Sequence, residues 1–303
     1  MEMSVFQRKI AALAGNIDIK YGEPMREHTS FRIGGGAEAM AFPKSEEELS
    51  CLLKAAGELG CRPRILGAGT NVLAPDAGLS GLIICLKDCL DGMELLDNCR
   101  IRVMAGVTMT RAAVFAANHG LSGLEFAHGI PGTVGGGVFM NAGAYGGEIC
   151  QVCESVRLME LDGSVREIPG EEMGFAYRSS RVQEEGGIIL SAVFALRAEA
   201  PERIREIMKE LMSRRSASQP LDLPSAGSAF KRPQGGYAAA LIEQAGLKGY
   251  RVGGAAISVK HAGFAVNTGG ATAWDVRELL RQVSDRVYEN SGIRLEPEVL
   301  VWE

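Results

Sequence analysis

The stretch "GIPGTVGGGVFMNAGAYGGE", residues 129–148, contains eight glycines in twenty positions. Glycine loses more conformational freedom on folding than other residues do, so this density is unfavourable unless the backbone must take positive φ angles or approach another group closely. A flat, anionic cofactor would supply such a need, because successive backbone N–H groups form concave anion sites. The composition also leaves open a pair of ordinary loops.

A second glycine-rich turn lies upstream in "PRILGAGTN", residues 63–71. Ile65 and Leu66 are typical of a short buried strand, and a strand that runs into such a turn presents backbone N–H groups to a phosphate in many α/β domains. The turn fails the Rossmann fingerprint because Val72 stands where the third glycine belongs. The chain has no Gly-Lys dipeptide, which excludes a Walker A loop.

Helices and strands are predicted around these two segments. Ser45 opens a capping box, "SEEE", and the helix that follows reaches Leu59 before Gly60 ends it. Another helix is expected from about Thr110 to Asn118. The predicted strands are "GLIICL" (81–86), "IRVMAGV" (101–107) and "GGIILSAVFALRA" (186–198), with "SVRLMELDGSVREI" (155–168) as a β-hairpin turning at "DG".

A domain boundary is predicted at Pro201, since proline suits the first position of a helix and "PERIREIMKELMSRRS" has helical spacing. The region beyond it should be a smaller α+β domain. Its predicted helices are "GYAAALIEQAG" (236–246) and "TAWDVRELLRQVSDRVYENSG" (272–292), and its predicted strands are "AAISV" (255–259), "FAVN" (264–267) and "LEPEVLVW" (295–302).

Composition excludes several classes of function. A net charge of −5 and a pI near 5.6 give no electrostatic footprint for nucleic acid. The longest apolar stretch, "IILSAVFAL", is far too short to span a membrane, so we expect a cytoplasmic protein. "CQVC" at 150–153 has the spacing of a redox or metal site, but it lacks a second pair and the four histidines show no ligand spacing. We therefore expect incidental thiols among the seven cysteines, with no disulfide framework and no metal.

Seven motifs together resemble one enzyme family. In chain order they are "HTSFRIGG", "LGAGTN", "GIPGTVGG", "NAGAYGGE", "YRSS", "AGSAFKRP" and "LEPEV", running from His28 to Val299. They resemble the UDP-N-acetylenolpyruvoylglucosamine reductases, also called UDP-N-acetylmuramate dehydrogenases. That resemblance implies NADPH-dependent reduction of the enolpyruvyl group of a UDP-sugar in peptidoglycan synthesis. The modest length of 303 residues suggests the shorter type of this family, which lacks an extra tyrosine-bearing loop.

The resemblance also implies a fold and a cofactor. The expected fold is α+β: a two-lobed FAD-binding fold of the vanillyl-alcohol-oxidase type, followed by a smaller α+β domain. The lobes would be residues 1–78 and 79–200, and the substrate-binding domain, with a C-terminal strand, would be 201–303. FAD would be bound noncovalently, with NADPH as co-substrate. The residues implied to hold FAD are Gly67, Ala68, Gly69, Thr70, Asn71, Val72, Gly129, Ile130, Pro131, Gly132, Thr133, Gly136, Asn141 and Gly143.

Three catalytic residues are implied by the same resemblance, and their chemistry suits the reaction. Arg178 would hold the substrate carboxylate, since a guanidinium is permanently charged and can bind in a bidentate way. Ser228 would protonate the carbanion, a base strong enough to take a hydroxyl proton. Glu298 would relay a proton or polarise the intermediate, and both roles stay open.

Three further residues are candidates for substrate binding: Tyr177, Lys231 and Arg215. In isolation each has an ordinary structural interpretation, and for Arg215 the capping of a helix is the favoured one. Two other functions compete with the reductase: a flavin oxidase of the same broad fold acting on a small hydroxy compound, and a nucleotide-binding regulatory protein without turnover. The sequence predicts no oligomeric state.

Overall fold

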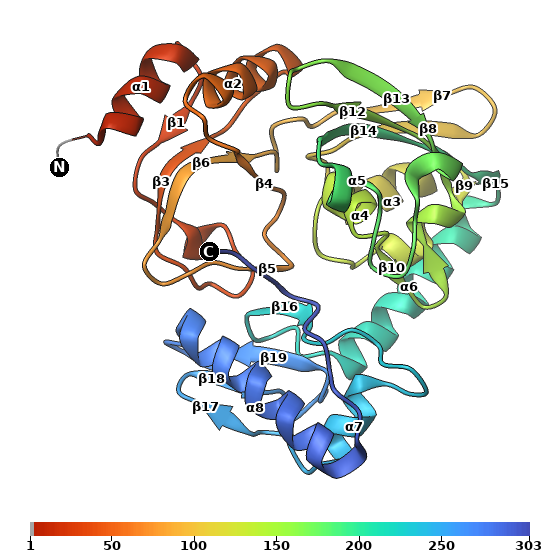
Figure 1. Cartoon of the computed structure of the whole chain (residues 1–303). Helices are drawn as coiled ribbons and strands as arrows, with labels where there is room; N and C mark the ends of the chain where they lie inside the picture. Colours follow the sequence, from red (N-terminus) through yellow and green to blue (C-terminus); the bar gives the residue numbers. More distant parts are fainter. Residues whose placement is uncertain (1–2) are drawn as a thin grey trace. The chain divides into compact units, whose positions relative to one another are not determined.

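The computed structural model describes residues 3–303, which form two compact units, each assembled from separate stretches of chain (Figure 1). Unit 1 contains the residues up to Tyr21, Ala39–Ala68 and Gly81–Arg214. Unit 2 contains Gly22–Glu38, Gly69–Ser80 and Arg215–Glu303. The chain therefore crosses repeatedly between the units, and no single cut separates them.

The first sheet of unit 1 is built around a parallel pair. Strands β4 (Arg64–Leu66) and β6 (Leu79–Cys85) pair with Leu66 opposite Cys85, in the order β1-β3-β6-β4 with β1 (Ile19–Lys20) and β3 (Gly36–Ala41). Helices α1 (Val5–Ala14) and α2 (Glu46–Glu58) cover buried leucines, isoleucines and alanines of this sheet. The strand predicted before the "GAGTN" turn is thereby confirmed.

Helix α2 begins as the sequence predicted, with one change. The Ser45 hydroxyl accepts from the Glu48 N–H at 3.2 Å, which satisfies one donor at the start of the helix. The Glu48 carboxylate accepts from the Lys44 N–H at 2.7 Å, where a complete capping box would use the Ser45 N–H.

The second sheet of unit 1 is antiparallel. Its order is β13 (Val165–Pro169), β12 (Cys153–Met159), β14 (Ile188–Ala195), β8 (Arg100–Met104) and β7 (Met93–Leu96). The predicted hairpin is confirmed, with Gly163 at φ 87° in its turn. Every β14 residue except Ala195 is buried, as its continuous apolar run indicates. Helices α3 (Met109–Asn118) and α4 (Val134–Phe139) share this core.

Unit 2 places a four-stranded antiparallel sheet against helices. The sheet order is β16 (Ser225–Ser228), β19 (Phe264–Asn267), β18 (Ala255–Ile257) and β17 (Arg251–Val252). Helix α7 (Ala238–Gln244) and the long α8 (Ala273–Ser291) supply apolar side chains to one core with the sheet. Thr272 and Asp275 form a complete capping box on α8, and Gly292 ends it in a left-handed conformation.

The remaining elements are short. The pairs are β9 (Leu121–Ser122) with β15 (Arg197–Ala198), β10 (Gly143–Ala144) with β11 (Gly147–Glu148), β5 (Val72–Leu73) with β20 (Leu300–Val301), and β2 (Glu23–Pro24) with β3. The single helical turns are η1 (Met25–Glu27), η2 (Glu125–Ala127), η3 (Ile149–Gln151), η4 (Gly170–Met173) and α5 (Val182–Glu185).

Three features differ from the sequence prediction. The glycine-rich "VGGGVF" forms helix α4 and is not a loop. Strand β7 was not predicted. The strand predicted across "LEPEVLVW" is wrong except at β20, because Pro297 lacks an N–H and residues 293–299 bond to loops and strand ends in place of a regular ladder.

The compact units follow boundaries other than the predicted divisions at 78/79 and 200/201. Helix α6 (Pro201–Ser218) starts where predicted but belongs to unit 1 as far as Arg214. Residues 22–38 and 69–80, although early in the sequence, belong to unit 2 because Phe31 and Leu73 are buried in its core. The α+β class is confirmed, while the division into cofactor lobes stays a prediction.

Residues 3–303 contain neither a membrane-spanning helix nor a cluster of metal ligands. No helix in this range has both the length and the apolar composition that a membrane crossing requires. The same residues contain no group of three or more His, Cys, Asp or Glu side chains arranged to hold a metal ion.

Candidate active site

The two glycine-rich segments meet within unit 1. Gly67 follows β4, and a Cβ atom on it would lie 2.5 Å from the Thr133 hydroxyl at the start of α4. Real Cβ atoms do not approach other atoms so closely, so position 67 requires glycine. The close approach that the glycine content predicted is therefore present, and its partner is the second glycine-rich segment itself.

The first turn of α4 already has hydrogen-bond acceptors. Val134 N–H donates to the Val107 carbonyl at 2.8 Å, Gly135 N–H donates to the Ala105 carbonyl at 2.9 Å, and Gly136 N–H donates to the Thr133 hydroxyl at 3.4 Å. Gly129 N–H likewise donates to the Thr110 hydroxyl at 3.2 Å. A diphosphate bound by "GIPGT" would therefore need other N–H groups, and the predicted contacts of Gly129, Ile130, Pro131, Gly132, Thr133 and Gly136 stay predictions.

The second half of the "GAGTN" turn belongs to unit 2. Gly69 has φ 61°, and a Cβ atom there would lie 2.0 Å from the His28 carbonyl oxygen. Its own carbonyl accepts from the Ser30 N–H at 3.1 Å. The motif "HTSF", which lies earlier in the sequence, thus packs against the turn, and Gly69 is the residue that permits the contact.

Arg178 lies at the tip of a tight turn in unit 1. Ala176 and Ser179 exchange both backbone hydrogen bonds at 3.1 Å, which leaves Tyr177 and Arg178 as the two central residues. Arg178 has φ 56°, an uncommon left-handed conformation for a residue with a long side chain. One of its guanidinium nitrogens, Nη2, donates to the Gly143 carbonyl at 3.3 Å. Backbone strain of this kind is frequent at functional sites.

Asn141 holds this turn in place. Its side chain is buried, and its amide nitrogen donates to the Ala176 carbonyl at 3.1 Å and to the Glu148 carboxylate at 3.2 Å. Its amide oxygen accepts from the Cys150 N–H at 3.0 Å. Both of its N–H donors thus have protein partners. The predicted cofactor contacts of Asn141 and Gly143 stay predictions, while the observed partners give Asn141 a positioning role.

Ser228 ends β16 immediately after a bulge. Ser225 pairs with Val266 and Ser228 with Phe264, so three steps on one strand oppose two on the other. Gly227 lies inside this irregularity with φ 76° and has open space around its Cα, so it supplies the conformation and no contact. Because the bulge adds a residue, it re-aims the Ser228 side chain, which is exposed.

Glu298 lies on an irregular segment, and both its backbone N–H and its backbone carbonyl are hydrogen-bonded. Its N–H donates to the Ala229 carbonyl at 2.9 Å, and its carbonyl accepts from the Asn71 side-chain amide at 3.1 Å. One residue pair away, Phe230 and Pro297 form an isolated bridge. Unit 2 therefore brings the backbones of Ser228 and Glu298 together, as the three-residue catalytic hypothesis requires of these two members.

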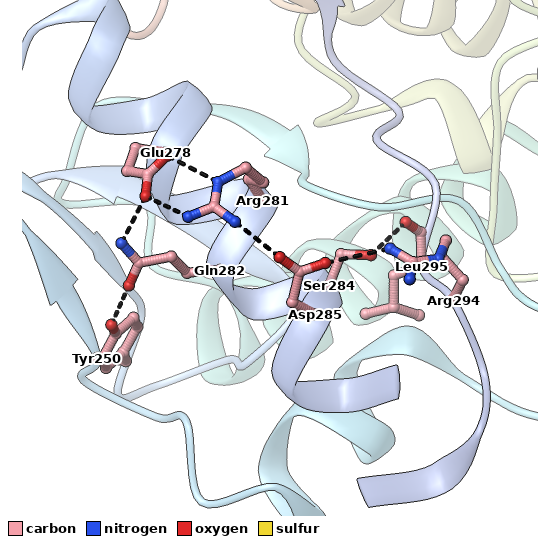
Figure 2. Close-up of polar contacts among 8 residues, drawn as sticks. All are labelled: Tyr250, Glu278, Arg281, Gln282, Ser284, Asp285, Arg294 and Leu295. Atoms are coloured by element: carbon pink, nitrogen blue, oxygen red, sulfur yellow. Dashed lines mark hydrogen bonds and ion pairs between the residues drawn. The ribbon is translucent and has the colours of Figure 1, made fainter. Parts of the chain in front are cut away.

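The segment is also anchored where it leaves α8. The Ser284 hydroxyl donates to the Leu295 carbonyl at 2.8 Å, and Arg294 contacts Asp285 at 3.1 Å (Figure 2). Arg281 links Asp285 to Glu278, and Gln282 connects Glu278 to the hydroxyl of Tyr250 (Figure 2). Hydrogen bonds from Arg281 and Gln282 lower the pKa of Glu278 to about 2.

The three predicted substrate residues lie in different surroundings. Tyr177 is exposed, and the Arg178 guanidinium lies 5.2 Å from its ring centre. Lys231 is exposed on its side chain and lies 3.5 Å from Glu296. Arg215 is buried, and its guanidinium donates to Gln219 at 3.1 Å, one helical turn away. Their substrate contacts stay predictions, and the Arg215–Gln219 pair agrees with the favoured helix-capping interpretation.

The "CQVC" thiols are poorly suited to redox chemistry. Burial raises the pKa of Cys153 to about 12, and burial is also the main cause that raises the pKa of Cys150. The thiolate is the reactive form, so both side chains stay protonated near neutral pH. All seven cysteines are free thiols.

Sequence reasoning missed the residues that position the site. Ser180 and Gln183 both donate to the Phe139 carbonyl at 2.8 Å and so fix the chain after Arg178 onto α4. Glu148 closes the "NAGAYGGE" motif and accepts from Asn141. Periodicity gives no signal for such side-chain-to-backbone bonds. Only the presence of Glu148 and Asn141 in one short motif could have suggested that they meet.

The comparisons with known proteins cover almost the whole chain. Residues 219–302 match the family model described as UDP-N-acetylenolpyruvoylglucosamine reductase, C-terminal domain, and residues 37–169 match the model described as FAD binding domain. A UDP-N-acetylenolpyruvoylglucosamine reductase of Streptococcus pneumoniae (strain JJA) is 42% identical over 299 residues, which are 99% of this chain and 98% of the relative.

Another relative and a solved structure agree. The protein of the same name from S. pneumoniae (strain ATCC BAA-255 / R6) is 41% identical and covers 99% of this chain and 94% of its own length. The crystal structure of UDP-N-acetylenolpyruvylglucosamine reductase from Thermus caldophilus superposes with a TM-score of 0.78 at 36% identity, over 95% of this chain and 99% of that one. The chain therefore belongs to the family of UDP-N-acetylenolpyruvoylglucosamine reductases.

Proposed function

We propose that this protein uses NADPH and noncovalently bound FAD to reduce the enolpyruvyl group of UDP-N-acetylglucosamine enolpyruvate, giving UDP-N-acetylmuramate for peptidoglycan synthesis in the cytoplasm. Its partners would be that UDP-sugar and NADPH, with no nucleic acid. The observation that carries the proposal is the adjacency of Ser228 and Glu298, joined through the 2.9 Å bond from Glu298 N–H to the Ala229 carbonyl, in a chain 42% identical to a named reductase.

The turns predicted to bind FAD fit an anionic group. Neither "GAGTN" nor "GIPGT" carries an acidic side chain, and the glycines at 67 and 69 allow the turn to pack closely on Thr133 and His28. Bound FAD would supply the hydride, received from NADPH and delivered from the flavin N5 to the β-carbon of the enolpyruvyl group. Binding of the substrate carboxylate and transfer of the proton would fall to side chains of this chain.

Arg178 would hold the substrate carboxylate, beside which negative charge develops. A guanidinium can bind a carboxylate in a bidentate way, and the Asn141 side chain bonds to the turn that carries it. Ser228 would donate its hydroxyl proton to the α-carbon, from the position that the β16 bulge gives it. Glu298 would return a proton to Ser228 or polarise the intermediate.

The test is anaerobic stopped-flow kinetics of the two half-reactions. Flavin reduction by NADPH is measured first, and the reduced protein is then mixed with the enolpyruvyl UDP-sugar. Ser228→Ala should slow flavin reoxidation by about 100- to 10,000-fold, the usual contribution of a general acid, while reduction by NADPH is unchanged. Ser225→Ala, three residues away on the same strand, serves as the matched control.

Two results would contradict the proposal. A protein purified without flavin that gains none from added FAD would favour the nucleotide-binding regulatory alternative. Reduced flavin that ignores the sugar but reacts quickly with oxygen would favour an oxidase. A Ser228→Ala protein that reoxidises at the wild-type rate would leave the reductase assignment intact and remove Ser228 from its role as acid.

A further inference from the structure

The side chain of Asn71 is hydrogen-bonded to the protein itself. Asn71 lies in the turn predicted to bind FAD, yet its amide nitrogen donates to the Glu298 carbonyl at 3.1 Å, across 227 residues of sequence. Its backbone carbonyl accepts from the Leu300 N–H at 3.0 Å, and the Leu73 carbonyl accepts from the Trp302 N–H at 3.0 Å. Three hydrogen bonds therefore join one short piece of the turn to the chain around Glu298.

These bonds matter because the segment has little regular secondary structure. Residues 293–299 have no regular strand or helix, and β20 is only two residues long. The Glu298 N–H is held by the Ala229 carbonyl, beside Ser228, while the Glu298 carbonyl is held by Asn71. The first contact is backbone to backbone and independent of side chains. The second depends on one amide group, so it is the contact that a substitution can remove.

We infer that Asn71 is a positioning residue that couples the occupancy of the 67–72 turn to the placement of Glu298. This inference rests on the proposed function for the identity of the occupant, FAD. A ligand that orders the turn also orders what the turn is bonded to, and the coupling equals the difference in its affinity for the ordered and disordered states. Asn71 and the parallel β5–β20 pair are the physical connection.

The chemistry of the amide makes the role testable. Asn71→Ala removes the donor and leaves a small space. Asn71→Asp keeps the size but sets a carboxylate oxygen against the Glu298 carbonyl, where a donor is needed. A positioning role through the hydrogen bond therefore makes Asp worse than Ala. A role in filling space makes Ala worse than Asp.

The first readout does not use enzyme activity. Amide hydrogen exchange at Glu298, Leu300 and Trp302 is measured in the full chain with and without saturating FAD. In the wild type FAD should slow this exchange by about ten-fold or more. In Asn71→Ala the two states should agree within about two-fold at Glu298, while Leu300 and Trp302, whose N–H groups donate to the backbone carbonyls of residues 71 and 73, should keep part of their response. Asn290→Ala is the matched control, since its side chain is exposed and bonds to Gln244 at 3.5 Å; it should keep the wild-type response.

The second readout separates positioning from general damage. At saturating FAD, flavin reoxidation by the UDP-sugar should fall by about ten-fold in Asn71→Ala and further in Asn71→Asp, with a smaller change in flavin reduction by NADPH. If Asn71→Asp does not fold, Asn71→Ser replaces it: the hydroxyl keeps a donor, so Ser should exceed Ala in reoxidation rate and in the exchange response.

The outcomes are distinct. A wild-type exchange response to FAD at Glu298 in Asn71→Ala, or an order in which Ala is worse than Asp, overturns the inference. A wild-type protein whose reduced flavin is not reoxidised by the sugar overturns the proposed function, while the exchange experiment still decides whether Asn71 links the turn to Glu298.

Discussion

Two predicted catalytic side chains are held by the same device in very different settings. In unit 1, Asn141 donates to the Ala176 carbonyl at 3.1 Å, beside Arg178, and in unit 2, Asn71 donates to the Glu298 carbonyl at 3.1 Å. Asn141 is 2% exposed and has two further partners, whereas Asn71 is half-buried. The Arg178 turn is thus held by a buried side chain with three hydrogen bonds. The Glu298 segment is held by a half-buried side chain and by backbone hydrogen bonds.

The difference suits the chemistry of each residue. Arg178 has one charge state and needs only a fixed direction, which a strained and fully bonded turn provides. Glu298 is expected to respond to the proton on Ser228, and it lies on a segment without regular secondary structure that is held by hydrogen bonds to Ala229 and Asn71. We therefore expect perturbations of the Arg178 support to appear mainly as lost stability, and perturbations of the Glu298 support as altered half-reactions.

The largest expected effect on stability is at Asn141. Asn141→Ala removes three hydrogen bonds in a buried place and puts alanine at φ 41°, so we expect unfolding to become easier by about 3 kcal/mol. The measurement is chemical denaturation, in which the dependence of the free energy of unfolding on denaturant concentration should be the same for wild type and variant. Asn290→Ala is the exposed control. A change below about 1 kcal/mol would mean that the turn does not depend on Asn141.

A smaller effect is expected at Ser284, on the other side of the comparison. Ser284→Ala removes the 2.8 Å bond to the Leu295 carbonyl, which should lower stability by about 1 kcal/mol. Because this bond anchors the segment before Glu298, flavin reoxidation should slow slightly as well. Asn290→Ala, whose exposed side chain bonds to Gln244, is the control. Equal kinetic effects in both variants would show that the anchor does not reach Glu298.

The smallest effect concerns the polar network of α8 (Figure 2). The pKa of Glu278 is lowered from 4.5 to about 2, so the carboxylate contributes stability that is fully present above pH 4.5 and is lost as pH falls toward 2. In Glu278→Gln the acid limb of the stability curve should be shallower over that range. Since the group lies at the surface, solvent screening keeps the effect small. If the stability of Glu278→Gln falls with pH as steeply as that of the wild type, other groups cause the acid sensitivity.

The sequence predicted elements whose signals are local. Ser45 and Thr272 mark helix starts through their own hydroxyls, and Gly163 marks a hairpin turn through its φ angle. Arg178, Ser228 and Glu298 are candidates because each lies in a short motif, and their catalytic roles stay predictions. The supports were not predictable in this way, because Asn71 and Glu298 are far apart in sequence and the bulge at Gly227 depends on the register with β19. Helix α4 was missed because glycine propensity opposes it and tertiary contacts at Val107 and Ala105 override that preference.

The discontinuous make-up of unit 2 has a consequence for synthesis on the ribosome. Residues 22–38 and 69–80 emerge early, but Phe31, Ile33 and Leu73 are buried by side chains from residues 226–299, and β5 has no partner strand until residues 300–301 are made. Chains are synthesised at about 5–20 residues per second, so these apolar side chains stay uncovered for tens of seconds. The early segments of unit 2 therefore expose apolar side chains on the nascent chain until the C-terminal part of the unit is made.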